Sequence, residues 1–173
     1  MSDLRYPVGP FEARKSITAD ERRTLIGMIA AAPRNLRAAV ANLSEQQLDT
    51  PYRDGGWTVR QVAHHVPDSH LNAYVRLKLA LTEENPTIKP YDEARWAALA
   101  DSRDPIDVSL TLLDSVTARW MSVMNAMRDE DFARNFVHPE HGPVNLDWLV
   151  QMYGWHSRHH VAHITTLRER NGW

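Results

Sequence analysis

The chain has 173 residues, with 20 basic against 22 acidic side chains and a formal net charge of −2. This length suits one compact domain over residues 1–173, which can bury about 70% of the surface that its unfolded chain exposes. The absence of cysteine excludes disulfides, thiolate metal sites, iron–sulfur clusters and a cysteine nucleophile. Any bound metal must therefore use nitrogen and oxygen ligands.

The sequence carries no targeting or membrane signal. Residues 1–10 mix acidic Asp3 with basic Arg5, and nowhere do 18 apolar residues follow one another. The lysines and arginines are scattered, which argues against nucleic acid or a membrane surface as a partner. We therefore expect a cytoplasmic protein that acts on small molecules.

Two capping boxes predict the first two helices. Thr18–Glu21 indicates a helix that starts near Ala19 and runs to about Asn42, kinked or split at Pro33. Thr58–Gln61 indicates a second helix, which reaches about Glu84 and is bent at Pro67.

Two further helices are predicted in the second half of the chain. Asp104 precedes Pro105 at the first helical position of a helix that ends near Met127, and Asn145 caps a helix that ends at Gly172. Residues 85–90 are expected to be a loop, 91–103 partly helical and 128–144 a connecting loop. With no convincing run of alternating strand residues, the pattern predicts a single-domain, all-α four-helix bundle.

The histidines carry the chemical information, and helical periodicity indicates which of them face the core. On the second helix, His65 lies about 60° from the centre of the apolar stripe, whereas His64 lies near the opposite, outer side. The stripe consists of Val62, Val66, Ser69, Ala73, Leu77 and Ala80. We therefore expect His65 to point inward and His64 outward, with Asp68 beside His64 on the outer face.

On the fourth helix, His156 and His160 lie within roughly 20° of the stripe formed by Leu149, Tyr153, Ile164 and Leu167. Residues at i and i+4 have Cβ atoms about 5–6 Å apart, so both imidazoles can reach one ion at about 2.0–2.1 Å. His163 lies one turn further on and is a candidate for the layer behind the ligands. His159 lies at the edge of the stripe and is expected to be solvated or bonded to backbone.

Together these positions predict one divalent transition metal held by His65, His156 and His160. A single inward histidine is more often a hydrogen-bonded core residue, but three on matching faces of two helices favour a ligand set. Ser157 follows His156 where an HExxH protease has its general base, and no Glu-x-x-His of a di-iron bundle is present. One mononuclear site remains, and hydrolysis there would need a base from elsewhere.

Several segments resemble the DinB superfamily, in particular its YfiT-like branch of proposed metal-dependent hydrolases, which is also similar to the bacillithiol S-transferases. They are Tyr52-Arg53-Asp54-Gly55-Gly56-Trp57-Thr58-Val59-Arg60-Gln61, His64-His65, Asp68-Ser69-His70, Pro90-Tyr91-Asp92-Glu93, Trp155-His156 and His160 to His163. The resemblance covers about residues 6–173. It implies a four-helix bundle, commonly a homodimer, that binds nickel or zinc through His65, His156 and His160.

These observations lead to a functional expectation: metal-dependent transfer of a low-molecular-weight thiol, resembling bacillithiol, to a small electrophile. Three neutral imidazoles leave zinc or nickel its full charge for a thiolate. The alternative is a metal-dependent hydrolase, and a second is a bundle that binds metal without turnover, including a closed site with His163 or Glu93 as fourth ligand.

Three residues flank the motifs and are candidates for the wall of a substrate pocket: Arg53, Asn72 and Tyr91. A solvated loop or an interhelix hydrogen bond is at least as good an interpretation of each. The sequence gives no interface for the expected homodimer.

Overall fold

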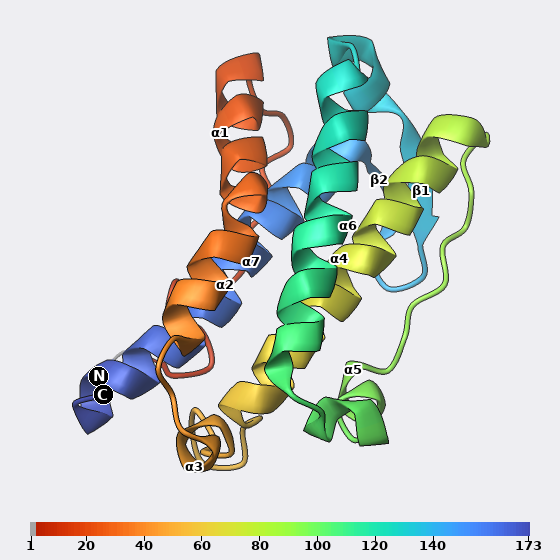
Figure 1. Ribbon diagram of the computed structural model, residues 1–173. Coiled ribbons are helices and arrows are strands. Elements are labelled where there is room, and N and C mark those ends of the chain that lie inside the picture. Colours follow the sequence, from red (N-terminus) through yellow and green to blue (C-terminus); the bar gives the residue numbers. More distant parts are fainter. Residues whose placement is uncertain (1–2) are drawn as a thin grey trace.

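The computed structural model describes residues 3–173 and is a four-helix bundle with a small hairpin at one end (Figure 1). In chain order the elements are α1 (Ala19–Ala30), α2 (Ala32–Val40), α3 (Glu45–Leu48), α4 (Val59–Thr82), α5 (Glu93–Trp96), the 3-10 helix η1 (Ala100–Arg103), α6 (Ile106–Ala126), the 3-10 helix η2 (Asp129–Ala133), β1 (Asn135–His138), β2 (Gly142–Asn145) and α7 (Leu146–Asn171). Among the described residues, no helix is both long and apolar enough to cross a membrane.

The predicted break in the first helix is confirmed. Residue Ala31 ends α1 and caps α2, whose first turn contains Pro33, where a missing amide hydrogen costs no helical bond. As predicted, the second helix continues past its internal proline, since α4 contains Pro67 without interruption and Pro67 is buried.

The predicted helix ends agree closely with the structure. Both capping boxes are present, with the Thr18 and Thr58 side chains accepting hydrogen bonds from the amides of Glu21 and Gln61. Gly172 ends α7 at φ +67°, a conformation that glycine adopts without strain. Pro105 differs by one position, since it is the N-cap residue of α6 and not its first helical residue.

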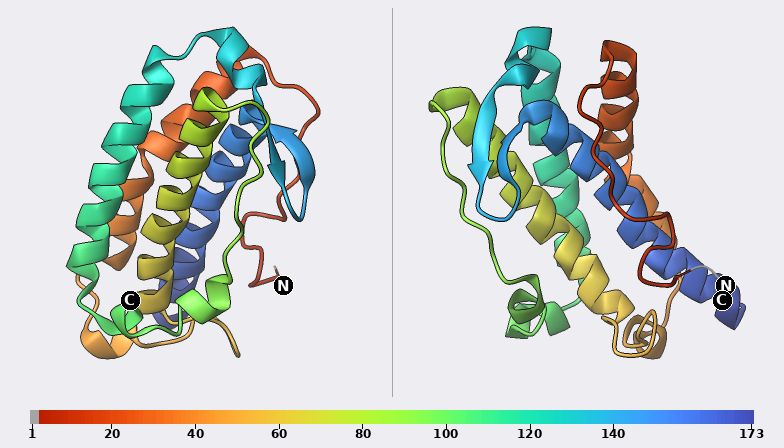
Figure 2. Two further views of the ribbon diagram at one scale, coloured as in Figure 1. Left: turned by 90° about the vertical axis from the view of Figure 1, so that its right-hand side faces the viewer. Right: turned by 180° about the vertical axis from the view of Figure 1, so that it is seen from behind.

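The order of the helices around the bundle is set by which pairs pack together. The helix pair α1/α2 packs against α7 and α6, and α4 packs against the same two helices. Thus α1/α2 lies diagonally opposite α4, and α6 lies diagonally opposite α7, an arrangement visible in the views of Figure 2. Long connections, residues 41–58 and 127–145, make these diagonal crossings possible.

The segment expected to be a plain loop contains a two-stranded hairpin, so that part of the prediction is wrong. Strands β1 and β2 pair antiparallel, with Phe136 opposite Val144 and the Phe136 side chain in the core. The Val137 backbone also bonds to Pro86 and Ile88, which joins the hairpin to the loop after α4. Strands of four residues are too short to give a readable alternation in the sequence.

The segment before α1 runs along α7 and is bound to it at three points (Figure 2, right). His163 Nε2 donates to the Arg5 carbonyl at 3.1 Å, and Trp155 Nε1 donates to the Gly9 carbonyl at 2.9 Å. Further along, the Gln151 side chain exchanges two hydrogen bonds with the Arg14 backbone. The N-terminal segment therefore covers one side of the histidine-bearing helix.

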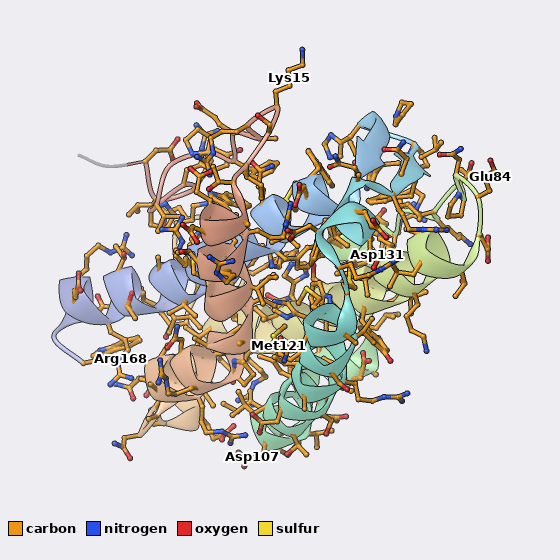
Figure 3. All side chains as sticks on the ribbon, turned by 90° about the horizontal axis from the view of Figure 1, so that it is seen from above. Lys15, Glu84, Asp107, Met121, Asp131 and Arg168 are labelled. Atoms are coloured by element: carbon orange, nitrogen blue, oxygen red, sulfur yellow. The ribbon has the colours of Figure 1, made fainter. Side chains whose placement is uncertain are left out.

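Apolar side chains fill the space between the four long helices. Trp120, Leu113, Leu77, Leu149 and Ile164 are fully buried there. Figure 3 shows this filling from above, with Lys15 and Asp107 pointing away from the bundle. The histidine cluster lies between two helices, α4 and α7, that this core holds at a fixed spacing.

A candidate metal centre between two helices

Three imidazoles converge at the interface of α4 and α7. His65 comes from α4, and His156 and His160 come from successive turns of α7. One ring nitrogen of each lies within 4.8 Å of the corresponding atoms of the other two. The centroid of the His65 ring is 5.3 Å from that of His156 and 4.7 Å from that of His160, and the two α7 rings are 4.4 Å apart.

The spacing of the nitrogens suits a small divalent ion. The Nε2 atoms of His65 and His156 are 3.3 Å apart. Two imidazole nitrogens that each bind zinc at about 2.05 Å with a tetrahedral angle are separated by about 3.3 Å. The residues present therefore fit a metal bound by three imidazoles. The structure brings together the three histidines that the sequence predicts to converge.

Burial keeps these imidazoles neutral, which is the form that binds metal. It lowers the pKa of His65 to about 4, with His163 as a smaller contribution. Burial also lowers the pKa values of His156 and His160 well below the ordinary 6.5. At neutral pH the cluster is thus a set of uncharged nitrogen donors.

Hydrogen bonds between Ser69 and Tyr153 join α4 to α7 next to the cluster. The Tyr153 hydroxyl on α7 donates to the Ser69 carbonyl on α4 at 2.9 Å. The Ser69 hydroxyl lies 3.0 Å from the Tyr153 hydroxyl oxygen. Both side chains are buried, where satisfied hydrogen bonds are directional and hard to break. Ser69 lies four residues after His65 and Tyr153 three before His156, so these hydrogen bonds join the two helices within one turn of the histidines.

The cluster lies at the bottom of a pocket of about 410 Å³. Aromatic rings and one thioether cover much of its wall, namely Tyr52, Trp57, Trp155 and Met152. Gly55 and Glu93 also line it and are solvent-exposed, so the pocket opens to the surface. A site of this kind admits a small molecule, unlike a closed structural metal shell.

The three predicted pocket residues have different positions. Arg53 lines the pocket beside the histidines. Asn72 is not among the lining residues and donates from Nδ2 to the Asp68 carbonyl within α4. Tyr91 is also absent from the wall; its hydroxyl is buried without a hydrogen-bond partner in residues 3–173, and burial raises its pKa.

The prediction that His64 lies on an outer face is wrong. His64 is buried, with Nδ1 2.7 Å from the Ser109 hydroxyl of α6 and Nε2 3.0 Å from the Asp104 carbonyl. It does face away from the cluster, but α6 covers that side of α4. Both ring nitrogens are occupied there, so Asp68 does not orient His64.

His159 and His163 form a layer beside the ligands. His159 was expected to be solvated or bonded to backbone, yet it is buried and stacks on Trp155 with centroids 4.2 Å apart. His163 stacks on Tyr52 at 3.9 Å while its Nε2 donates to the Arg5 carbonyl. A ring nitrogen of each lies within 4.8 Å of one on His160, so His159, His160 and His163 form a second group of nitrogen donors that shares His160 with the first.

Glu93 is the acidic residue on the pocket wall, at the start of α5. Glu93 is exposed as a residue, but partial burial of its carboxyl group raises the pKa; Glu140 on the hairpin turn raises it further, and Arg76 lowers it. The sequence indicated Glu93 only as a fourth ligand of a closed structural site. The tight cluster contains the three imidazoles and, among the described residues, no carboxylate.

Comparison with known proteins agrees with this geometry. The family model of the DinB superfamily matches residues 28–164. The chain belongs to the DinB superfamily. Two relatives, from Bacillus cereus and Bacillus thuringiensis subsp. konkukian, are each 53% identical to it over all 173 residues and over their own full length. Both bear the name "Putative metal-dependent hydrolase".

Solved structures confirm the fold of this DinB protein. YfiT from Bacillus subtilis, described as a probable metal-dependent hydrolase with an unusual four-helix bundle topology, superimposes with a TM-score of 0.95 and 46% identity over 98% of both chains. The four-helix bundle protein TT2238 matches with a TM-score of 0.60 and 21% identity, over 84% of this chain and 98% of its own. The chain is therefore a single-domain four-helix bundle of the YfiT type.

Proposed function

We propose that the protein is a metal-dependent hydrolase of a small substrate, with zinc or nickel held by His65, His156 and His160. The observation that carries this proposal is the convergence of three neutral imidazoles at the bottom of a pocket that opens to solvent. When bound, such an ion supplies Lewis acidity and lowers the pKa of water to about 7. The similarity to relatives named as metal-dependent hydrolases supports the same reaction class.

Glu93 can serve as the general base that hydrolysis requires and that the position after His156 does not provide. Hydrolysis needs a group that takes a proton from attacking water, and the residue after His156 is serine. Glu93 lies on the pocket wall, and its raised pKa brings the carboxylate closer to the basicity that proton transfer near neutral pH requires. We assign it the role of general base, outside the ligand set.

The other wall residues hold the reacting groups and limit water. Trp57 lies with its ring centroid 4.7 Å from that of His65, and Trp155 stacks on His159. These rings fix the imidazoles by packing and make much of the wall apolar. Charges inside the pocket are consequently screened less than charges on the surface.

Thiol transfer is the second candidate, because the same ligand set can bind a thiolate and the chain has no cysteine of its own to occupy the ion. The two reactions differ in the nucleophile. A carboxylate base in the pocket favours water, since a metal-bound thiol loses its proton without such a base.

The deciding experiment gives metal-loaded protein a panel of small esters and amides, and separately bacillithiol with a chlorobimane electrophile. We expect turnover of an ester or amide that disappears with a chelator and in His160→Ala, and falls about 10²-fold or more in Glu93→Gln. Metal-dependent conjugation of the thiol without hydrolysis would assign the transferase instead. Equal rates with loaded, chelated and His160→Ala protein would rule out both reactions.

A further inference from the structure

Arg53 lies at the edge of the histidine pocket, in a turn closed by two backbone hydrogen bonds. The Gly56 amide donates to the Arg53 carbonyl at 2.9 Å, and the Tyr52 amide donates to the Trp57 carbonyl at 3.0 Å. Gly55 has φ +65°, which favours glycine at that position. The turn therefore fixes the backbone of Arg53 at the edge of the pocket.

Gly56 makes room for the Arg53 side chain. A Cβ at position 56 would lie 2.8 Å from Arg53 Cγ and 3.2 Å from the Tyr52 ring. The guanidinium carbon of Arg53 lies 5.4 Å from the centroid of that ring, and its Nη1 donates to the Asp54 carbonyl at 2.8 Å. Tyr52 in turn stacks on His163, so these contacts connect the arginine to the histidine layer.

The guanidinium still has binding capacity. Within residues 3–173 no carboxylate forms an ion pair with Arg53, and its Nε is buried without a hydrogen-bond partner. Asp3 is close enough for Arg53 to contribute slightly to lowering its pKa, but the main cause is Arg5, which binds the Asp3 carboxylate at 2.8 Å. Arg53 is thus a cation without an anionic partner among the described residues, and its Nε is an unsatisfied donor.

The charges of the wall favour an anion. Arg53 is the basic residue and Glu93 the acidic residue among those that line the pocket, and the histidines are neutral. A divalent ion on three neutral imidazoles adds two positive charges, so the loaded pocket is positive overall. An arginine fork also matches the geometry of a carboxylate.

We propose that Arg53 binds an anionic group of the substrate, so that the pocket selects small molecules with a carboxylate at one end and the reacting bond near the histidines. This assignment deepens the proposed function, since it names the substrate class for the same site. Arg53 acts here as a specificity-determining residue and takes no part in proton transfer.

The test measures binding of two hydroxamates to zinc-loaded protein by calorimetry. Succinic acid monohydroxamate carries a carboxylate at the far end, and butyrohydroxamic acid is its neutral counterpart of similar length. We expect the first to bind about tenfold more tightly, the effect of one charge-assisted hydrogen bond. The preference should fall to about onefold in Arg53→Met and to an intermediate value in Arg53→Lys.

The matched control is Arg158→Met, which removes the same charge from an exposed position of α7 outside the pocket wall. It should keep the tenfold preference. Equal binding of the two probes by the unaltered protein would overturn the assignment, and so would an undiminished preference in Arg53→Met, which would make the ion alone responsible. Thermal unfolding of Arg53→Met and Arg158→Met checks that each variant is folded.

This binding test does not depend on turnover. Zinc-loaded protein that prefers the carboxylate probe through Arg53 but hydrolyses nothing would remove the hydrolase proposal and keep the anion-binding role. Turnover of neutral and anionic substrates at equal kcat/KM by both the unaltered protein and Arg53→Met would keep the hydrolase proposal and remove the anion-binding role.

Discussion

The imidazole of His64 lies 2.7 Å from the Ser109 hydroxyl, on the side of α4 that faces away from the histidine cluster. His65, the next residue, points into the cluster at Nε2. Two adjacent histidines of one helix thus have separate roles, one in packing α4 on α6 and one in the pocket between α4 and α7.

This separation predicts opposite effects of two alanine substitutions. His64→Ala should lower the free energy of unfolding by about 1–3 kcal/mol, because it leaves the buried Ser109 hydroxyl without its partner, and should keep the metal. His65→Ala should lose most of the bound metal, as should His156→Ala and His160→Ala. Metal analysis of the purified variants, combined with denaturant titration, measures both quantities. Loss of metal from His64→Ala with retention in His65→Ala would contradict the assigned ligand set.

A pH profile of hydrolysis tests the role of Glu93. A base must be ionised, so activity should fall as the pH decreases through the raised pKa of Glu93. Glu140 raises that pKa and Arg76 lowers it. We therefore expect Glu140→Gln to move the acid limb of kcat/KM to lower pH, and Arg76→Met to move it to higher pH. An acid limb that stays in place in both variants would assign it to another group, such as a protonating ligand.

Two glycines predict stability changes of opposite sign. A Cβ at Gly154 on α7 would lie 2.7 Å from Leu25 Cδ2 and 3.3 Å from Leu25 Cβ on α1, so Gly154→Ala should force the helices apart and cost about 1–3 kcal/mol. Gly27 on α1 is exposed and has no neighbour within 4 Å of such a Cβ. Gly27→Ala should therefore stabilise the protein by about 0.5–1 kcal/mol. Thermal unfolding measures both, and a stabilised Gly154→Ala would show that α1 and α7 are not in close contact.

We also predict a homodimer, with a mass of about twice 19.8 kDa in light scattering at micromolar concentration. Exposed apolar side chains lie on α4 and α6, at Leu71, Val75, Val108 and Leu112. If that surface is shared between the copies, Leu112→Asp should shift the mass toward the monomer, whereas Lys15→Asp on the N-terminal segment should not. A monomer in the unaltered protein would remove the prediction.

Local signals in the sequence were sufficient for the helices. Capping boxes at Thr18 and Thr58 and the glycine at 172 act within a few residues, so their effect does not depend on the rest of the fold. The diagonal order of the helices depends on contacts between distant segments, which periodicity does not contain. The hairpin was missed because its strands are short and gain stability from residues 86–88.

The convergence of the three histidines was predictable for a related reason, and the pocket wall was predictable only in part. His65, His156 and His160 lie on helices, where phase determines direction. Of the wall candidates Arg53 lines the pocket but Asn72 and Tyr91 do not, and the loops and short helix around the pocket follow paths that no simple period describes. His64 shows a limit of helical periodicity. An apolar stripe identifies one buried face of a helix, whereas other helices cover two faces of α4.

The diagonal arrangement has a consequence for when the three histidines meet during folding. Among the long helices, α4 and α6 are consecutive in the chain and pack directly on each other, whereas α7 packs on α1/α2 and α4 and has no extensive contact with its predecessor α6. His65 and His156 are 91 residues apart in sequence. Docking of α7 therefore brings the three imidazoles together in one step, which depends on non-local contacts. A chain that still lacks α7 contains only His65 of the three, so the candidate site and the pocket around it form together.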